Sequence, residues 1–509
     1  MAFLCETVDR RVIPNWRSLN DTISNGELEY PILSKPLFDL EEYVQQWKNH
    51  HSLIYASELV NAAVANSVLD NDEAKKAAEF ILSHETKVTY SQIQVASSLL
   101  SPSEVANRYN GEFDELLVNV EDIYAKIGYL KSLIHKYPYN PINYVEVARF
   151  YLMIGQTKKA VEMINIATSI GSQSRFVSRS AARLFVHIGD IDKAQYTLKL
   201  NRNLLCDPWL MASEISVNLL RNRSSSLIKN AVLMVNGGDY GPFSLSELTS
   251  SLGTLEFIKG TLRKSRIYFN KSLISPNDNA LAQAEWANSN KINLNFNRAV
   301  CDKVNMKYEA IAMYEYQKGN YDKALKYSIR WLNDMPYSKS PVYVGANIAY
   351  TFLHDYEKAA KILKRGLEAN PNEAAFLNNL AYTYALDGKL EMANDVLMRL
   401  DRVNDIDDRT KICLTATRGL IAYREKRIQD GRKLYLEAIK NAKEILDDPT
   451  YNWSAMLNYI REEIMVSNVS PIEVETILNQ IKERPHDLGI KALKRDVLSL
   501  VHIIGDSRG

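Results

Sequence analysis

The sequence predicts an all-α chain of helix hairpins stacked into a solenoid. Within residues 340–400 two stretches repeat in register, so that Ala359 and Ala393 hold the same place in consecutive copies. Glycine (20) and proline (15) are scarce among 509 residues, which favours helices over strands and tight turns. Apolar residues recur at spacings of three and four, the period of a helix with one buried face. Because one such hairpin cannot bury its own apolar face, neighbouring hairpins must stack.

Residues 1–38 form an N-terminal arm that differs from the rest of the chain. Pro14, Pro31 and Pro36 interrupt any helix, and Asn25-Gly26 is typical of a turn. We expect the arm either to cap the first helices or to bind a partner. From Asp39 the pattern becomes helical, and residues 39–140 are predicted to be an N-terminal helical region with degenerate repeats.

A first regular block is predicted over residues 141–279. The interval between Gly155 and Gly189 equals the interval between Ala160 and Ala194, and both equal that between Ala359 and Ala393. Each glycine would close the first helix of its hairpin in the left-handed conformation, and each alanine would let the two helices approach closely. Within this block Ser244-Leu245-Ser246-Glu247 has the pattern of a capping box at a helix start.

The repeat then becomes irregular and recovers. Residues 280–304 are too few for a full hairpin, and the asparagine-rich run 288–297 indicates a break. A second block follows over residues 305–445. Residues 446–509 are predicted to form a C-terminal helical cap, because a stacked array needs its last apolar face covered.

The spacing and residue types resemble the tetratricopeptide repeat, a helix–turn–helix unit of about 34 residues. The residues that carry the resemblance within 340–400 are Tyr343, Ala346, Tyr350, Tyr356, Ala359, Leu363, Gly366 and Pro371, answered by Leu377, Leu380, Tyr384, Leu390, Ala393, Leu397 and Leu400. The resemblance implies a right-handed α-solenoid whose concave groove binds a protein or peptide partner.

In this family the groove is lined by first-helix positions that point away from the seam. Carried over to this chain, they are Arg149, Arg179, Arg183, His187, Arg221, Tyr316, Asn378, Tyr382, Tyr423 and Arg424. The arginines would suit an acidic segment of the partner. Alternatively, they are only solvated or paired with Glu146 and Glu214. If they bind a partner, changing Arg179 and Arg183 to glutamate should weaken capture without unfolding the chain.

One specialised mode of the family is not expected. Relatives that clamp the C-terminal carboxylate of chaperones use lysine and asparagine from consecutive repeats. Asn379 stands at one such position, but the preceding repeat has Val344 and Ile348 where the lysine and asparagine are required.

Composition and motifs argue against several other classes of protein. With 62 basic and 61 acidic residues the net charge is +1, which disfavours nucleic-acid binding. The four cysteines are far apart and form no zinc pattern, and no catalytic or nucleotide-binding motif occurs. No signal peptide is evident, nor any apolar run long enough to cross a membrane. The sequence therefore predicts a cytoplasmic, non-enzymatic protein without cofactor, metal or membrane segment, and it leaves the oligomeric state open.

Two functions remain from different classes. The first is a scaffold or adaptor that holds a protein or peptide partner in its groove. The second is a sensor or regulatory subunit, as in bacterial relatives of this type, that controls a separate effector enzyme when it binds a peptide or foreign protein. A third, RNA binding by helical repeats, conflicts with the charge balance.

Overall fold

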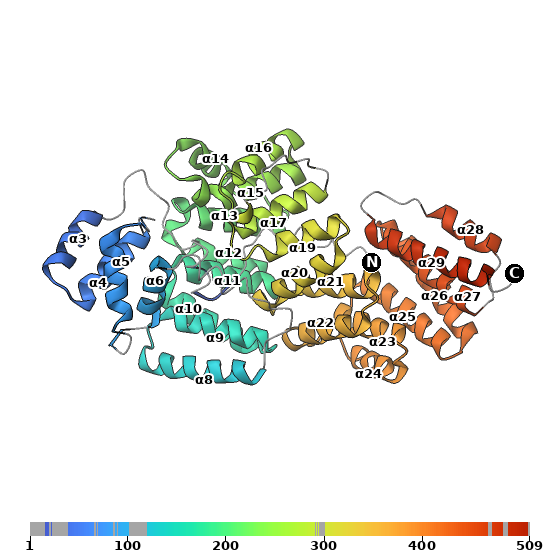
Figure 1. The fold of residues 1–509 in the computed structure, drawn as a ribbon. Helices are drawn as coiled ribbons and strands as arrows, with labels where there is room; N and C mark the ends of the chain where they lie inside the picture. Colours follow the sequence, from blue (N-terminus) through green and yellow to red (C-terminus); the bar gives the residue numbers. More distant parts are fainter. Residues whose placement is uncertain are drawn as a thin grey trace. The chain divides into compact units, whose positions relative to one another are not determined.

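A computed structural model describes residues 16–19, 22, 39–65, 68, 70–84, 87–88, 90–100, 120–290, 292, 294, 301–466, 471–481 and 487–506. Within these ranges the chain is helical and contains no β-strand (Figure 1). Contacts divide it into two units. We call residues 9–152 and 156–310 the N-terminal unit, and residues 311–506 with 153–155 the C-terminal unit.

The helices of the N-terminal unit follow each other with short connections. They are α3 (Leu40–Asn49), α4 (Leu53–Ala65), α5 (Asp72–Leu82), α6 (Tyr90–Leu100), α8 (Val120–Lys136), α9 (Pro141–Met153), α10 (Thr157–Gly171), α11 (Arg175–His187), α12 (Ile191–Lys199), the 3-10 turn η2 (Arg202–Leu205), α13 (Pro208–Leu220), α14 (Ile228–Gly237), α15 (Pro242–Lys259), α16 (Leu262–Ser272) and α17 (Asp278–Ser289).

The C-terminal unit continues the same order of elements, and the division between the units falls near the start of its first helix. It contains α19 (Tyr308–Gln317), α20 (Tyr321–Asp334), α21 (Lys339–Asn347), the π-helical turn η3 (Ile348–Phe352), α22 (Tyr356–Ala369), α23 (Ala374–Leu386), α24 (Leu390–Leu400), α25 (Asp408–Arg424), α26 (Ile428–Ile445), α27 (Pro449–Met465), α28 (Pro471–Gln480) and α29 (Leu488–Asp506). The predicted all-α solenoid of helix hairpins is confirmed.

The seams between paired helices are closed by small residues, as the repeat predicts. Ala160, Ala194, Ala359 and Ala393 are all fully buried. At Gly366 a Cβ atom would lie 2.7 Å from a methyl carbon of Val342, so no larger residue fits without displacement. The seam alanines and this glycine allow helix axes to approach closely enough for the next hairpin to pack.

The turns inside the hairpins use left-handed backbone, as predicted for the glycines. Gly189 has a φ of 86° and Gly388 a φ of 74°. His354 and Lys426 adopt the same conformation with φ values of 52° and 65°. The turn geometry is therefore kept where the glycine of the repeat is absent.

The first helices of successive hairpins form a curved row in each unit. In the N-terminal unit α11 packs against α13, α13 against α15, and α15 against α17. A side chain of α11, Arg179, also reaches Glu247 of α15, two hairpins further on. Such a contact requires the row to curve toward that side, which we call the inner face of the unit. In the C-terminal unit α23, α25 and α27 form the corresponding row.

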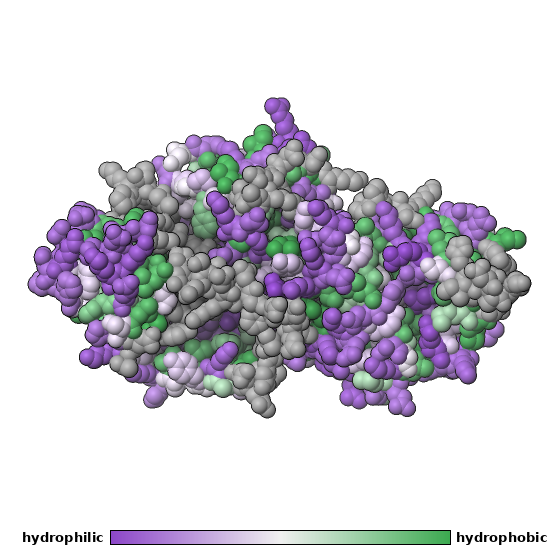
Figure 2. Space-filling view, viewed as in Figure 1, coloured by the Kyte–Doolittle hydropathy of each residue, from purple (hydrophilic) through white to green (hydrophobic). Residues whose placement is uncertain are grey.

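Both ends of the chain pack as helical layers. In the N-terminal unit α3 to α6 share a core around Trp47, Leu59, Ile81 and Leu99. In the C-terminal unit α27, α28 and α29 share a second core, which includes Ile464 and contains the three helices predicted for the cap. Figure 2 shows hydrophilic side chains over much of α3 and α4, with apolar side chains in small separate patches.

One local prediction differs from the structure, and others fall on residues that the structure does not describe. The predicted capping box at Ser244–Glu247 is wrong, because α15 begins at Pro242 and these four residues lie inside the helix. Proline at the first helical position starts the helix three residues earlier than a capping box at Ser244 would. Most of the N-terminal arm, and residues 295–300 of the irregular unit, lie outside the described residues.

Candidate partner-binding faces

The inner face of the N-terminal unit is polar and almost fully buried. Residues 208–218 of α13, 244–254 of α15 and 278–287 of α17 are buried without interruption. Helices buried on every side normally carry apolar residues all round, but these carry serines, glutamates, asparagines and glutamines. Their polar groups must therefore bond to one another.

The hydrogen bonds of this face join consecutive hairpins. Ser250 Oγ and Thr254 Oγ1 of α15 donate to the side-chain oxygen of Gln283 in α17, at 2.8 and 3.1 Å. The hydroxyls of Ser216 in α13 and Ser251 in α15 lie 3.1 Å apart. These contacts fix the side chains of the inner face before any partner arrives, which lowers the entropy cost of binding.

A buried ion pair crosses the same face. Arg179 of α11 donates to Glu247 Oε2 at 2.7 Å, and the Asn277 amide donates to the other oxygen of that carboxylate at 2.7 Å. The Arg179 guanidinium also lies 5.2 Å from the ring centre of Trp209. Burial raises the pKa of the Glu247 carboxyl, whereas Arg179 and Asn277 favour its charged form and limit the rise.

Three of the arginines predicted to line a groove have acidic partners within the chain. Arg149 Nε lies 3.7 Å from Glu146, which is one of the two pairings considered as an alternative to partner binding. Arg179 pairs with Glu247, and Arg221 pairs with Asp192.

Two sequence expectations about these arginines need correction. Glu214 is not ion-paired with them in the described structure and instead accepts from Asn218 at 2.6 Å. The expectation that Arg179→Glu would leave the fold intact is wrong, because the new carboxylate would face buried Glu247.

Arg183 differs from the other predicted arginines. It lies one helical turn after Arg179 on α11 and is only 6 % exposed. Its Nε atom is buried without a hydrogen-bond partner, and no described residue forms an ion pair with it. A buried, unpaired guanidinium is costly, and an anion would offset that cost. His187, one further turn along, lies at the end of α11 and is partly buried.

The inner face of the C-terminal unit carries rings and amides at the predicted positions, and most of them contact other parts of the unit. The Tyr382 hydroxyl donates to Asn458 of α27 at 2.9 Å, and the Tyr423 hydroxyl donates to Glu463. Arg424 Nε lies 3.0 Å from Glu462, which is 2 % exposed. The C-terminal cap thus supplies the partners of these three residues.

The two remaining predicted residues are enclosed. Tyr316 is 5 % exposed and stacks edge-on against Phe352, and burial raises its pKa. Asn378 is 1 % exposed, and its Nδ2 atom lies 3.4 Å from Oδ1 of Asn379. The structure therefore brings together Tyr382, Tyr423 and Arg424 along α27.

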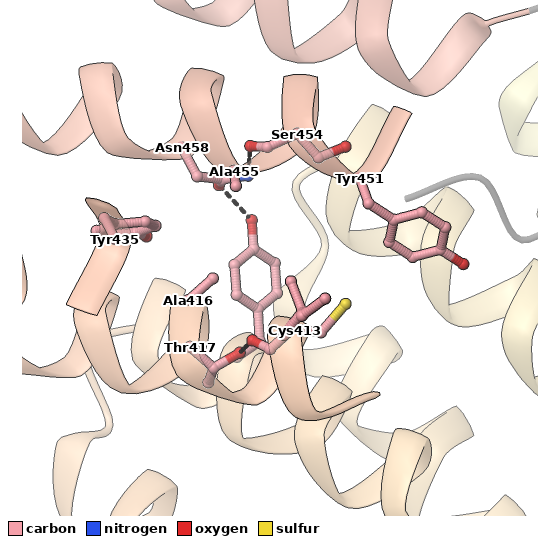
Figure 3. Close-up of a pocket in the computed structure, with 10 residues that line it drawn as sticks. Cys413, Ala416, Thr417, Tyr435, Tyr451, Ser454, Ala455 and Asn458 are labelled. Carbon is pink, nitrogen blue, oxygen red and sulfur yellow. Dashed lines mark hydrogen bonds between the residues drawn. The ribbon is translucent and has the colours of Figure 1, made fainter. Parts of the chain in front are cut away.

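A small cavity lies beside Tyr382 in the C-terminal unit. Figure 3 shows Cys413, Ala416 and Thr417 of α25 on one side of it and Ser454, Ala455 and Asn458 of α27 on the other. The Tyr382 hydroxyl donates to Asn458 at 2.9 Å. The cavity measures about 30 Å³ and is lined by Tyr382, Ile412, Cys413, Ala416, Thr417, Tyr435, Tyr451, Ser454, Ala455 and Asn458. This volume holds one or two water molecules, which is too small for a cofactor.

Sequence reasoning missed the acidic partners of these faces. Glu247 lies 68 residues after Arg179, which is two repeat lengths, so the register itself could have indicated the pair. Glu462 and Glu463 of α27 lie beyond the regular repeats and carry no such signal.

Metal sites and membrane spans were two further features to look for in the described part of the chain. No group of three or more His, Cys, Asp or Glu side chains among the described residues could hold a metal ion. No described helix has the length and apolar character needed to cross a membrane.

No family model and no curated protein matches the sequence. The chain is similar in structure to the human IFIT1 dimer with PPP-AAAA, with 15 % identity, 78 % of this chain and 99 % of that chain covered, and a TM-score of 0.36. Yeast Tom70 matches with 14 % identity, 79 % and 95 % covered, and a TM-score of 0.29. The P58(IPK) TPR domain matches with 13 % identity, 71 % and 98 % covered, and a TM-score of 0.21.

These TM-scores carry no argument about function. The hairpins of the chain itself, with their constant period, buried seam alanines and left-handed turns, are of the tetratricopeptide type. Repeat architectures of this kind generally serve as interaction scaffolds.

Proposed function

We propose that the chain is a non-enzymatic scaffold that binds a protein partner, and that an acidic segment of the partner pairs with Arg183 on the inner face of the N-terminal unit. The observation that carries this proposal is the burial of Arg183 without an ion pair among the described residues. A carboxylate from a partner would accept the two parallel hydrogen bonds that a guanidinium donates best.

The surroundings of Arg183 support a protein segment as the ligand. Arg179 and Arg149 already have carboxylates beside them, so the local charge left to be neutralised is that of a single arginine. A carboxylate side chain of a protein segment can neutralise it by accepting from the guanidinium. The balanced net charge of +1 agrees with this preference.

We also propose that this scaffold works in the cytosol. Cys206 is an exposed free thiol, which agrees with a reducing compartment.

The test uses a fluorescently labelled octaglutamate peptide and the full chain. We expect saturable binding by fluorescence anisotropy, at least tenfold weaker in Arg183→Met. Arg266→Met on α16 removes the same charge from an exposed position and should bind as the wild type does. Binding should weaken as salt is raised, because part of the attraction is between charges.

The thermal stability of Arg183→Met distinguishes a role of Arg183 in binding from a role in the fold. Arg183→Met removes a buried charge with no partner, so it should melt at the wild-type temperature or above it. Equal octaglutamate binding by Arg183→Met and the wild type would refute the acidic-ligand assignment. A large loss of stability would show that Arg183 serves the fold.

A further inference from the structure

Part of the N-terminal arm is buried inside the N-terminal unit. Trp16 and Arg17 are each 2 % exposed, and Thr22 is 7 % exposed. Arg17 donates to Asp278 Oδ2 at 2.8 Å and to the main-chain oxygen of Met306 at 3.4 Å. The main-chain N–H of Leu19 donates to Glu146 Oε1 at 2.7 Å. These three hydrogen bonds hold the segment Trp16–Leu19 in two places.

These two places lie at opposite ends of one row of helices. Glu146 belongs to α9, and Asp278 is the first residue of α17. Between them in the chain stand the first helices α11, α13 and α15. Four residues span at most about 14 Å, so α9 and α17 approach each other on the side toward which the row curves. Trp16–Leu19 therefore lies against the inner face.

The segment meets the same carboxylates that organise this face. Glu146, which accepts from Leu19, is also the partner of Arg149. Asp278, which accepts from Arg17, directly follows Asn277, the residue that holds Glu247 in its pair with Arg179. The segment is bound as a peptide ligand would be, with one side chain in a charged pocket and one main-chain N–H bonded to the wall.

The pocket for Arg17 has the chemistry of an arginine-binding site. Asp278 is 5 % exposed and supplies a carboxylate, and the Met306 carbonyl supplies a second acceptor. If Arg17 leaves, these two acceptors can receive another guanidinium.

We propose that the inner face of the N-terminal unit is a binding site for an extended protein segment with an aromatic residue followed by arginine. The chain fills this site with its own Trp16 and Arg17, and a partner segment of the same chemistry enters by displacing them. This site differs in its chemistry from the one at Arg183. Arg183 would bind an acidic side chain of a partner, whereas Asp278 would bind a basic one.

The test supplies the segment as a separate molecule. A labelled peptide with the sequence of residues 12–22 is titrated into the full chain carrying Trp16→Ala and Arg17→Ala, and anisotropy is measured. We expect saturable binding to this variant and at least tenfold weaker binding to the wild type, whose site is filled. Adding Asp278→Asn to the variant should abolish binding, and a peptide with alanine at both key positions should not bind.

The wild-type chain provides a second measurement if the double variant does not fold. Hydrogen exchange read by mass spectrometry should show slow exchange at residues 16–19, and an excess of the unlabelled peptide should accelerate it. Absence of peptide binding by a folded double variant would overturn the proposal. So would exchange at residues 16–19 that stays slow and unchanged with excess peptide. The octaglutamate experiment tests Arg183 and this one tests Asp278, so either result can fail alone.

Discussion

Arg183 in the N-terminal unit and Tyr382 in the C-terminal unit hold the same place in their repeats. Each stands six residues before the left-handed glycine of its hairpin, Gly189 or Gly388. Tyr382 donates to Asn458 of α27, two first helices further on. Arg183 has no such partner among the described residues. The same position thus has a hydrogen-bond partner in one unit and none among the described residues of the other.

The two inner faces differ more widely in how they are held together. Arginine–carboxylate pairs and small hydroxyl groups link the first helices of the N-terminal unit. In the C-terminal unit tyrosines fill the face, and Tyr423 meets the carboxylate of Glu463 in the helical cap. Charged pairs deep in a face are costly to break, whereas rings contribute mainly by area. The same repeat geometry therefore accommodates an inner face held by charged pairs and an inner face filled by aromatic rings.

The largest expected effect lies in the N-terminal unit. Arg179→Leu leaves Glu247 buried without its guanidinium and should lower the free energy of unfolding by about 3–5 kcal/mol. The measurement is urea denaturation followed by circular dichroism. Adding Glu247→Leu should recover most of the loss, because both charges are then gone. A double variant no more stable than Arg179→Leu would contradict the assigned pair.

A smaller effect is expected for the corresponding contact of the C-terminal unit. Tyr423→Phe removes one hydrogen bond to Glu463, which keeps both bonds from Arg432 at 2.9 and 3.0 Å. The loss should be about 1–2 kcal/mol in the same urea experiment. Tyr139→Phe, at a position 84 % exposed, is the matched control and should change nothing. A loss as large as that of Arg179→Leu would remove the distinction between the two faces.

The smallest effect concerns pH and the last helix. Asp496 of α29 lies 3.7 Å from His354 and also faces Arg495 and Arg461, but burial raises the pKa of its carboxyl. A raised pKa in the folded state means that the protonated form is favoured on folding. The stability gained in this way is complete below the ordinary pKa of aspartate and is lost as pH rises through the raised value.

Asp496→Asn should therefore raise the melting temperature at pH 7 by less than about 2 °C, and the difference should shrink toward pH 4. Scanning calorimetry of the full chain at several pH values measures it. If the wild type melts higher than Asp496→Asn at pH 7, the pairing of Asp496 with His354 outweighs burial and the expected sign is reversed.

The repeat register made most of the fold predictable. Ala359 and Ala393 placed the seams, and Gly189 and Gly388 placed the turns, because these positions depend only on contacts within one hairpin. The same register identified inner-face positions such as Arg183. It could not supply their partners, since Glu463 and Asn458 belong to a cap without repeats. Arg17 was missed for the same reason, because an aperiodic arm carries no signal of where it docks.

The bond between Arg17 and Asp278 joins residues 261 positions apart, in a fold whose other contacts are mostly between neighbouring hairpins. A ribosome adds about 5–20 residues per second, so roughly 13–50 seconds separate the synthesis of the two residues. Throughout that interval the arm lacks its contact with α17, while hairpin after hairpin assembles behind it. Newly made chains should thus expose the tryptophan to chaperones and proteases until α9 and α17 have both been synthesised.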